Sequence, residues 1–181
     1  MRPFRVVVTG SECTGKTTLA RLLAERFGAP WAPEFARAYF DAKGTPLDAS
    51  DVEPIARGQV AGEDAAEATA QGLLVLDTDL LSTAVYARHY YGACPAWVEE
   101  AARARRADLY LLCAPDLPWE ADGQRDRGEA RDEMHGLFAR ALERLGAPTA
   151  LVSGTGEARL EAAFAAVRAA RRRSPGTAHA G

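Results

Sequence analysis

Eight residues near the amino terminus, from Gly10 to Thr17, have the types and the spacing that bind phosphate groups. They read GSECTGKT and match the pattern G-x-x-x-x-G-K-[ST] in full. The two fixed glycines let the backbone turn tightly, so that successive N–H groups converge on a phosphate. Lys16 is expected to bridge the β- and γ-phosphates of a nucleoside triphosphate, and the Thr17 hydroxyl to bind Mg²⁺. The predicted nucleotide-binding residues are Gly10, Ser11, Glu12, Cys13, Thr14, Gly15, Lys16, Thr17, Thr18 and, from a later segment, Arg127.

Two carboxylates follow a later apolar run. Asp77 ends the segment LLVLD, and Asp79 comes two residues further on. A carboxylate at the end of a buried parallel strand faces the crevice where such sheets bind ligands. We therefore expect Asp77 to hold Mg²⁺ together with Thr17, and to take part in catalysis. Asp79 is expected to contact the substrate, with a helix cap as the alternative.

The segment PEFARAY, from Pro33, could face the same crevice from the acceptor side. Glu34 is the candidate to accept the proton of a substrate hydroxyl or to bind a ribose hydroxyl, which makes it both a catalytic and a substrate-binding residue. Arg37 is the second substrate-binding candidate, and Tyr39 could project to the same side. The alternative is an ordinary solvated start of a helix with a glutamate near its N-terminus.

Residues 116–128 form a polar, turn-rich segment that combines an aromatic side chain with two arginines. Arg125 is predicted to neutralise charge on the transferred phosphoryl group, and Arg127 to contact the nucleotide, from a lid that closes over the site. Trp119 could stack on a flat ring, and Asp122 is a further candidate to bind the substrate. A charged surface loop with Trp119 packed on its base is the alternative.

Short apolar runs alternate with long helical patterns, which indicates how these side chains are positioned. Strands are predicted at 4–9, 73–77, 108–113 and 149–152, with a short extended piece at 29–32. Helices are predicted at 17–27, 33–39, 80–91 and 95–106, and two more are predicted, one on either side of the last strand. A further helical pattern covers 48–70, where Pro54 and Gly58 could divide the helix in two. Strands joined through helices must run parallel, with helices on both faces. We predict an α/β fold, namely a three-layer P-loop NTPase with about five parallel strands and a mobile lid.

Composition limits the class of protein. The 181 residues suit one domain, which we place at 1–173 and follow with a disordered tail at 174–181. A net charge of −3 argues against a nucleic-acid partner, because a general polyanion binder needs a dominant basic face. Three cysteines without CxxC spacing suit a reducing compartment, and no apolar run is long enough for a membrane span. We expect a cytoplasmic protein with no membrane partner.

Other motifs narrow the kind of P-loop protein. The N-K-x-D motif of GTPases and the LSGGQ signature are absent, and the chain is short for a AAA+ module. A small kinase for a nucleoside or a metabolite remains. A non-kinase, ATP-dependent switch is a competing class, although such a switch needs no small acceptor pocket.

These segments together resemble the ribosylnicotinamide kinase domain of NadR-type proteins and their stand-alone P-loop relatives. The resemblance runs over about residues 4–155 and rests on GSE of the phosphate loop, PEFAR from Pro33, DTDL from Asp77, PW from Pro118 and DGQR from Asp122. Cys13 departs from the serine usual in such loops, and Ala38 from an acidic residue. Because the first strand begins at Phe4, we expect neither the adenylyltransferase nor the helix-turn-helix domain.

The resemblance implies a function. It implies phosphorylation of nicotinamide riboside at its 5′-hydroxyl by ATP with Mg²⁺, giving nicotinamide mononucleotide in NAD biosynthesis. The partner expected is thus a small riboside, and homo-oligomer formation stays open. A P-loop kinase for another nucleoside or small metabolite is the nearest alternative.

Overall fold

The computed structural model describes residues 2–117 and 131–174. Their strands form one parallel sheet with the order β2-β3-β1-β4-β5. The strands are β1 (Phe4–Thr9), β2 (Trp31–Ala32), β3 (Leu73–Asp77), β4 (Leu109–Cys113) and β5 (Thr149–Val152). Every residue of β1, β3 and β4 is buried, as the continuous apolar runs predict for strands that are covered on both faces. The predicted three-layer α/β fold is confirmed.

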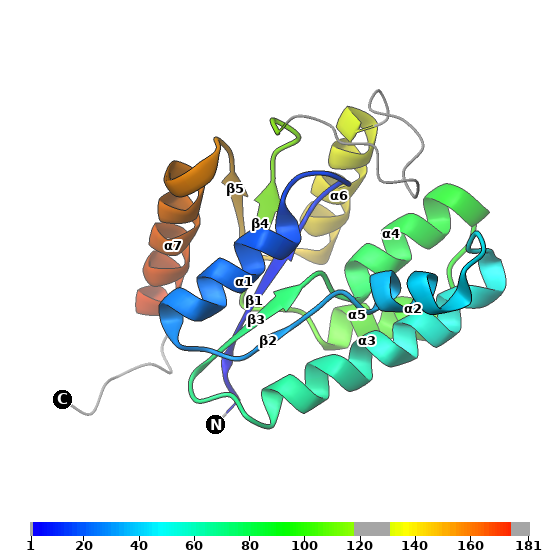
Figure 1. Ribbon diagram of the computed structural model, residues 1–181, viewed down its shortest axis with the longest axis horizontal. Helices are drawn as coiled ribbons and strands as arrows, with labels where there is room; N and C mark the ends of the chain where they lie inside the picture. Colours follow the sequence, from blue (N-terminus) through cyan, green and yellow to red (C-terminus); the bar gives the residue numbers. More distant parts are fainter. Residues whose placement is uncertain (1, 118–130, 175–181) are drawn as a thin grey trace.

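Helices cover both faces of the sheet (Figure 1). They are α1 (Lys16–Phe27), α2 (Phe35–Lys43), α3 (Val52–Glu67), α4 (Leu80–Tyr91), α5 (Ala96–Ala104), α6 (Arg131–Leu145) and α7 (Gly156–Arg173), with a 3₁₀ turn η1 (Ala49–Asp51) before α3. Leucine and alanine side chains of α1 and α7 pack on one face of the sheet, and those of α4 and α6 pack on the other. The phosphate loop joins β1, the central strand, to α1.

Residues 48–70 hold one α-helix rather than two, which corrects one sequence-based expectation. Pro54 lies in the first turn of α3, where a backbone N–H has no partner within the helix, so proline is tolerated there. Gly58 lies inside α3 and faces the ring of Phe35. Glycine therefore makes room for a neighbouring side chain here and does not end the helix.

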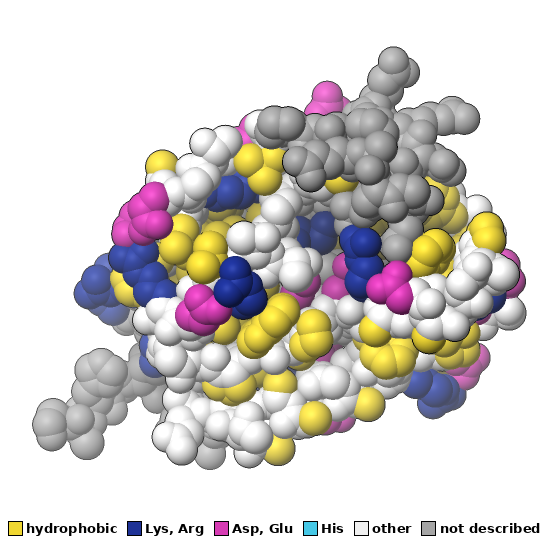
Figure 2. Space-filling view, viewed as in Figure 1, with side chains coloured by type: hydrophobic (Ala, Val, Ile, Leu, Met, Phe, Trp, Pro, Cys, Tyr) yellow, Lys and Arg dark blue, Asp and Glu magenta, His cyan; other side chains and the backbone are white. Residues whose placement is uncertain are grey.

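Charged side chains of both signs are interspersed on the face of the molecule shown in Figure 2. Several are paired across elements; for example, Arg26 of α1 lies 2.5 Å from Glu161 of α7. Within residues 2–117 and 131–174, no helix has both the length and the apolar character needed to cross a bilayer.

Candidate active site

The phosphate loop has backbone conformations that depend on its two fixed glycines. Gly10 has a φ of +138°, and a Cβ atom at this position would lie 2.9 Å from the carbonyl oxygen of Cys113 in β4. Gly15 has a φ of +72° and precedes the first residue of α1. Cys13, between them, also has a positive φ, of 52°. The loop thus turns tightly against the sheet, as the motif predicts.

The start of α1 has room for an anion. No side chain caps this helix among the described residues, and its first turn contains no acidic residue. Its first N–H groups and the positive end of its dipole therefore remain available to a phosphate. Lys16 is buried, and its Nζ donates to the carbonyl oxygen of Ser11 at 2.8 Å. The Ser11 hydroxyl is buried without a hydrogen-bond partner among the described residues, which indicates a ligand contact at this loop.

Thr17 and Asp77 meet beside the phosphate loop. The Thr17 hydroxyl donates to Oδ2 of Asp77 at 2.6 Å, whereas Oδ1 of Asp77 is buried with no partner in the described part of the chain. Burial raises the pKa of Asp77 to about 6, and the nearby charge of Glu34 acts in the same direction. A cation at Oδ1 would relieve this cost.

The residues at this point fit Mg²⁺. In the described residues, no three His, Cys, Asp or Glu side chains form a metal cluster. Mg²⁺ commonly uses one or two protein ligands and completes its shell with phosphate oxygens and water. Thr17 and Asp77 supply a hydroxyl and a carboxylate of this kind, next to the loop that would hold the phosphates.

Asp79 is used within the protein as a helix cap. It is the N-cap of α4, where Oδ1 accepts from the Leu81 N–H at 3.0 Å. Oδ2 accepts from the Tyr110 hydroxyl at 2.7 Å, and the side chain is buried. The helix-cap alternative is thus observed for Asp79, and its expected contact with the substrate stays a prediction.

Glu34 is positioned by contacts between α2 and α3. It is the N-cap residue of α2 and directly precedes Phe35. The Phe35 N–H donates to Oε1 of Gln59 at 3.0 Å, and Gln59 is itself buried. The Phe35 ring packs over Gly58 in α3. These contacts hold the start of α2, and with it Glu34, in place.

A pocket of about 410 Å³ begins at the phosphate loop and extends between α2 and α4. Lys16 and Glu34 line it together. Its other charged residues are Glu12, Arg37, Asp48 and Asp51, and its aromatic residues are Phe40, Tyr86, Tyr90 and Tyr91. The pocket thus joins the candidate phosphate site to a wall of aromatic rings and carboxylates.

Tyr86 is the residue of this pocket that sequence reasoning missed most plainly. Burial raises the pKa of its hydroxyl well above the ordinary value, and the negative charges of Glu12 and Glu34 add to the shift. Its ring lies edge-on to Phe138 of α6 at 5.5 Å between centroids. Tyr86 is one of several tyrosines near the end of α4, and nothing in its sequence context separates it from its neighbours.

The far end of the pocket is held by a cluster of polar side chains around Asp51. The Tyr39 hydroxyl donates to Oδ1 of Asp51 at 2.9 Å, and Lys43 pairs with both Asp51 and Asp48. Asp48 and Asp51 also form a capping box at η1. Tyr39 therefore stabilises the pocket wall through Asp51, beside the loop between α2 and α3.

Two buried arginines hold the phosphate loop from outside. Arg159 of α7 donates to the carbonyl oxygen of Thr14 at 2.8 Å and to Asp116 at 2.8 Å. Arg131 of α6 donates to the carbonyl oxygen of Cys13 at 3.3 Å. Sequence reasoning did not select Arg159, which is 145 residues from Thr14 along the chain.

The predicted lid residues lie outside the described residues. This applies to Trp119, Asp122, Arg125 and Arg127, and to residues 175–181 of the predicted tail. The roles expected for these side chains remain predictions.

Comparison with known proteins places this geometry among P-loop proteins. A family model described as "AAA domain" matches residues 5–159, although the length of the chain had argued against a AAA+ module. The trifunctional NAD biosynthesis/regulator protein NadR of Escherichia coli (strain K12) is 33% identical over 152 residues. That match covers 79% of this chain and 37% of NadR, so the chain spans little more than a third of the relative's length.

Solved structures agree with the sequence comparison. A NadR protein in complex with NR is 28% identical with a TM-score of 0.76, over 95% of this chain and 50% of that one. A NadR protein in complex with NAD and AMP-PNP is 29% identical with a TM-score of 0.74, over 92% of this chain and 49% of that one. The similarity therefore extends over nearly all of this chain and about half of each solved one.

Proposed function

The chain belongs to the P-loop family described as AAA domain, and from its similarity to NadR we propose that it is an ATP-dependent kinase that phosphorylates the 5′-hydroxyl of nicotinamide riboside. The products are nicotinamide mononucleotide and ADP. The observation that carries the proposal is the continuity of two sites: Lys16 of the phosphate loop and Glu34 of the acceptor side line one pocket. An enzyme that transfers a phosphoryl group needs this adjacency, because both reactants must be held in contact.

The lining of the pocket supports a flat, cationic acceptor. Nicotinamide riboside carries a positive charge on its aromatic ring. Aromatic faces attract such a cation by about 0.5–2 kcal/mol, depending on how far it is desolvated. Phe40, Tyr86, Tyr90 and Tyr91 contribute aromatic rings to the lining of the pocket. The carboxylates of Glu12 and Glu34 add negative charge on the same side.

The ligands of the solved NadR structures agree with the proposed substrates, nicotinamide riboside and ATP. A NadR protein has been solved with NR, and another with NAD and AMP-PNP, the latter a nonhydrolysable analogue of ATP. For this chain the two ligands would occupy the acceptor pocket and the phosphate loop. The chain corresponds to about half of those proteins, so the proposal covers only the kinase reaction.

Each proposed residue role corresponds to one part of the phosphoryl transfer. The oxygen of the acceptor hydroxyl forms a bond to the γ-phosphorus, and the bond between this phosphorus and the β–γ bridging oxygen breaks. Glu34 accepts the proton of the hydroxyl. Lys16 and the N–H groups at the start of α1 stabilise the negative charge on the phosphates. When bound, Mg²⁺ would be held by Thr17 and Asp77 and would neutralise charge on the β- and γ-phosphates.

A panel of acceptors tests the proposal directly. ADP formation is measured with Mg²⁺ and ATP, without acceptor and with nicotinamide riboside, cytidine, uridine, adenosine and thymidine in turn. We expect rapid ADP formation only with nicotinamide riboside, accompanied by nicotinamide mononucleotide in a chromatographic assay. Faster turnover with another nucleoside would assign the site to a different kinase. Acceptor-independent hydrolysis at the full rate would favour a nucleotide-dependent switch.

Glu34→Gln tests the acceptor side separately. The change keeps the shape of the side chain but removes the base, so kcat should fall by about 10²–10⁴-fold. The affinity for AMP-PNP, measured by titration calorimetry, should stay within about twofold, because Glu34 does not belong to the phosphate loop. Glu53→Gln is the matched control, since Glu53 is exposed on α3 and pairs with Arg57 outside the pocket. An equal loss of AMP-PNP binding in Glu34→Gln would contradict the assigned role.

Trp119 and Arg125 can be tested although they lie outside the described residues. If Trp119 stacks on the cationic ring, Trp119→Ala should raise KM several-fold for nicotinamide riboside and less for a neutral nucleoside. If Arg125 acts on the transferred phosphoryl group, Arg125→Ala should lower kcat with little change in KM. Equal effects of Trp119→Ala on charged and neutral acceptors would remove the cation–π argument.

A further inference from the structure

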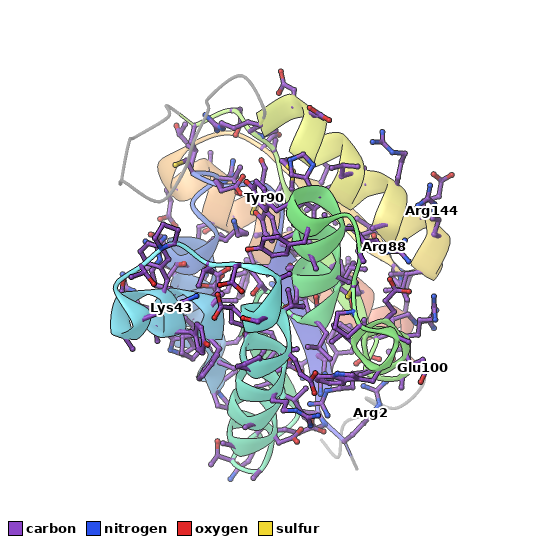
Figure 3. The ribbon with its side chains drawn as sticks, turned by 90° about the vertical axis from the view of Figure 1, so that its right-hand side faces the viewer. Arg2, Lys43, Arg88, Tyr90, Glu100 and Arg144 are labelled. Carbon is purple, nitrogen blue, oxygen red and sulfur yellow. The ribbon has the colours of Figure 1, made fainter. Side chains whose placement is uncertain are left out.

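A second groove, of about 650 Å³, lies between α4, α5 and α6. It contains none of the residues of the phosphate loop or of the acceptor pocket. Helix α4 separates the two sites: Leu81, Val85 and Arg88 line the groove, whereas Tyr86 and Tyr90 line the acceptor pocket. Figure 3 shows Tyr90 and Arg88 on different sides of α4, with Arg88 on the side of Arg144. The groove is therefore distinct from the candidate active site.

The floor of this groove is apolar. Leu81 and Val85 come from α4, Ala102 from α5, and Leu137 and Ala141 from α6. The two residues from α4 are four positions apart, as are the two from α6, and this spacing places side chains on one face of a helix. A volume of this size lies within the range of sites for small organic ligands. The floor would accept an aromatic or aliphatic body.

The rim of the groove is rich in arginine. Arg88, Arg103, Arg106 and Arg144 line it, against two acidic residues. Glu99, one of the two, already pairs with Arg88 and, at 3.8 Å, with Arg103. On this side of the rim, two guanidinium groups thus already share one carboxylate of the protein.

On the other side of the rim, the arginines share no carboxylate in the described part of the chain. Arg106 donates to the carbonyl oxygens of Leu145 at 3.4 Å and Gly146 at 3.2 Å, and pairs with no carboxylate among residues 2–117 and 131–174. Arg144 is exposed on α6 and makes no ion pair in that same part of the chain. Glu133 of α6, the other acidic residue of the lining, forms no ion pair with either arginine in the described part of the chain. Two guanidinium groups therefore border an apolar floor without a paired carboxylate. Guanidinium groups bind carboxylate, sulfonate and phosphate groups through paired N–H donors.

We propose that this groove is a second binding site, for a small amphipathic anion. The apolar body of the ligand packs on the floor between α4 and α6, and its carboxylate, sulfonate or phosphate group pairs with Arg106 and Arg144. Neither half of the site alone would select such a compound: the floor supplies affinity for the apolar body, and the rim selects the charge. The site is independent of the kinase reaction proposed above.

A pair of fluorescent probes tests the proposal with the full-length protein. 8-Anilinonaphthalene-1-sulfonate has an aromatic body and one sulfonate, and N-phenyl-1-naphthylamine is its uncharged counterpart. Both are titrated in the presence of Mg²⁺ and saturating AMP-PNP, which occupies the phosphate loop. We expect the sulfonate to bind at one saturable site per chain, at least about fivefold more tightly than the uncharged probe.

Three variants locate the probe. Arg144→Glu should weaken sulfonate binding at least about fivefold, because it reverses a charge on the rim. Ala141→Trp should abolish binding by filling the floor. Arg140→Glu is the matched control, since Arg140 is exposed on the same helix and does not line the groove, and it should leave the affinity unchanged. Far-UV circular dichroism verifies the fold of each variant.

Two results would overturn the proposal. The first is equal affinity of wild type and Arg144→Glu for the sulfonate. This variant is decisive because the side chain of Arg144 is exposed, so its replacement should not disturb folding. The other is equal affinity of wild type for the two probes, since the arginines would then contribute nothing.

Discussion

Asp77 is a buried carboxylate whose second oxygen has no partner among the described residues, and its chemistry connects stability with metal binding. Its pKa is raised to about 6, first because of burial. The ordinary pKa of an aspartate side chain, which applies to the unfolded chain, is 3.8. The ionised form is therefore costly in the folded protein until a cation compensates it. Asp79, two residues away, also has a pKa raised to about 6 by burial, but its oxygens are used by the helix cap and by Tyr110.

The pKa of Asp77 predicts the effect of pH on stability. A carboxyl whose folded pKa is raised contributes stability below its unfolded pKa, and that contribution is lost as pH rises through the folded pKa. Between about pH 4 and pH 6, rising pH should therefore lower the free energy of unfolding of the metal-free protein. Asp77→Asn removes this titration, and at pH 8 the variant should unfold with a free energy higher by on the order of 1–3 kcal/mol.

Urea denaturation at pH 4 and pH 8, without Mg²⁺, measures this difference. Asp132→Asn, an exposed position in the first turn of α6, serves as the control, and it should lower the free energy of unfolding by at most about 1 kcal/mol, because it removes only an interaction with the helix dipole. The gain in stability should come with a loss of function: the affinity for AMP-PNP with Mg²⁺ should rise more steeply through pH 6 in wild type than in Asp77→Asn, where only the ligand titrates. A variant less stable than wild type at pH 8 would show that Asp77 has a structural role instead.

At the scale of secondary structure, the contact between α2 and α3 sets the position of Glu34. Gly58 lies inside α3, where glycine normally costs about 1 kcal/mol relative to alanine. A Cβ atom at this position would lie 2.1 Å from Cε1 of Phe35. Gly58 is therefore needed for the close approach of the Phe35 ring. Phe35 directly follows Glu34, the proposed base.

Two glycine-to-alanine substitutions in α3 should have opposite effects. Gly62 faces open space, so Gly62→Ala should stabilise the protein by about 1 kcal/mol and leave activity unchanged. Gly58→Ala should displace Phe35, destabilise the protein by about 1–3 kcal/mol and raise KM for the acceptor. Thermal unfolding and steady-state kinetics measure both effects. A stabilising Gly58→Ala with normal kinetics would show that Phe35 can move without disturbing Glu34.

At the scale of the whole molecule, Arg159 connects the phosphate loop to the carboxyl-terminal part of the chain. Its guanidinium donates to the carbonyl oxygens of Thr14, Gly154 and Ala114 and to the carboxylate of Asp116. These partners lie in the phosphate loop and in the loops that follow β4 and β5. The geometry of the nucleotide site thus depends on α7, which contributes no residue to the acceptor pocket.

Arg159→Met should test this connection. The variant leaves buried carbonyl groups without donors, so we expect a loss of stability on the order of 2–4 kcal/mol. The affinity for AMP-PNP should also fall, because the phosphate loop is no longer held in its conformation. Arg168→Met, on the exposed side of the same helix, is the control and should change neither quantity appreciably. Unchanged AMP-PNP binding in Arg159→Met would mean that the loop holds its shape alone.

Local patterns in the sequence determined the sheet and the phosphate loop. Strands β1, β3 and β4 were predictable because a strand covered on both faces needs a continuous apolar run, and the run itself is visible. The loop from Gly10 to Thr17 was predictable because its function depends on consecutive backbone positions. Thr17 and Asp77, 60 residues apart, could be paired in advance, since strand ends of a parallel sheet meet at one edge.

Tertiary structure alone decided how the remaining side chains are used. Asp77 and Asp79 follow the same apolar run, but Asp77 keeps an oxygen without a partner among the described residues, whereas the oxygens of Asp79 accept from Leu81 and Tyr110. Tyr86 and Arg159 carry no local signal, because their roles come from contacts with segments distant along the chain. The role of a side chain depends on which distant groups surround it, and spacing along the sequence does not contain that information.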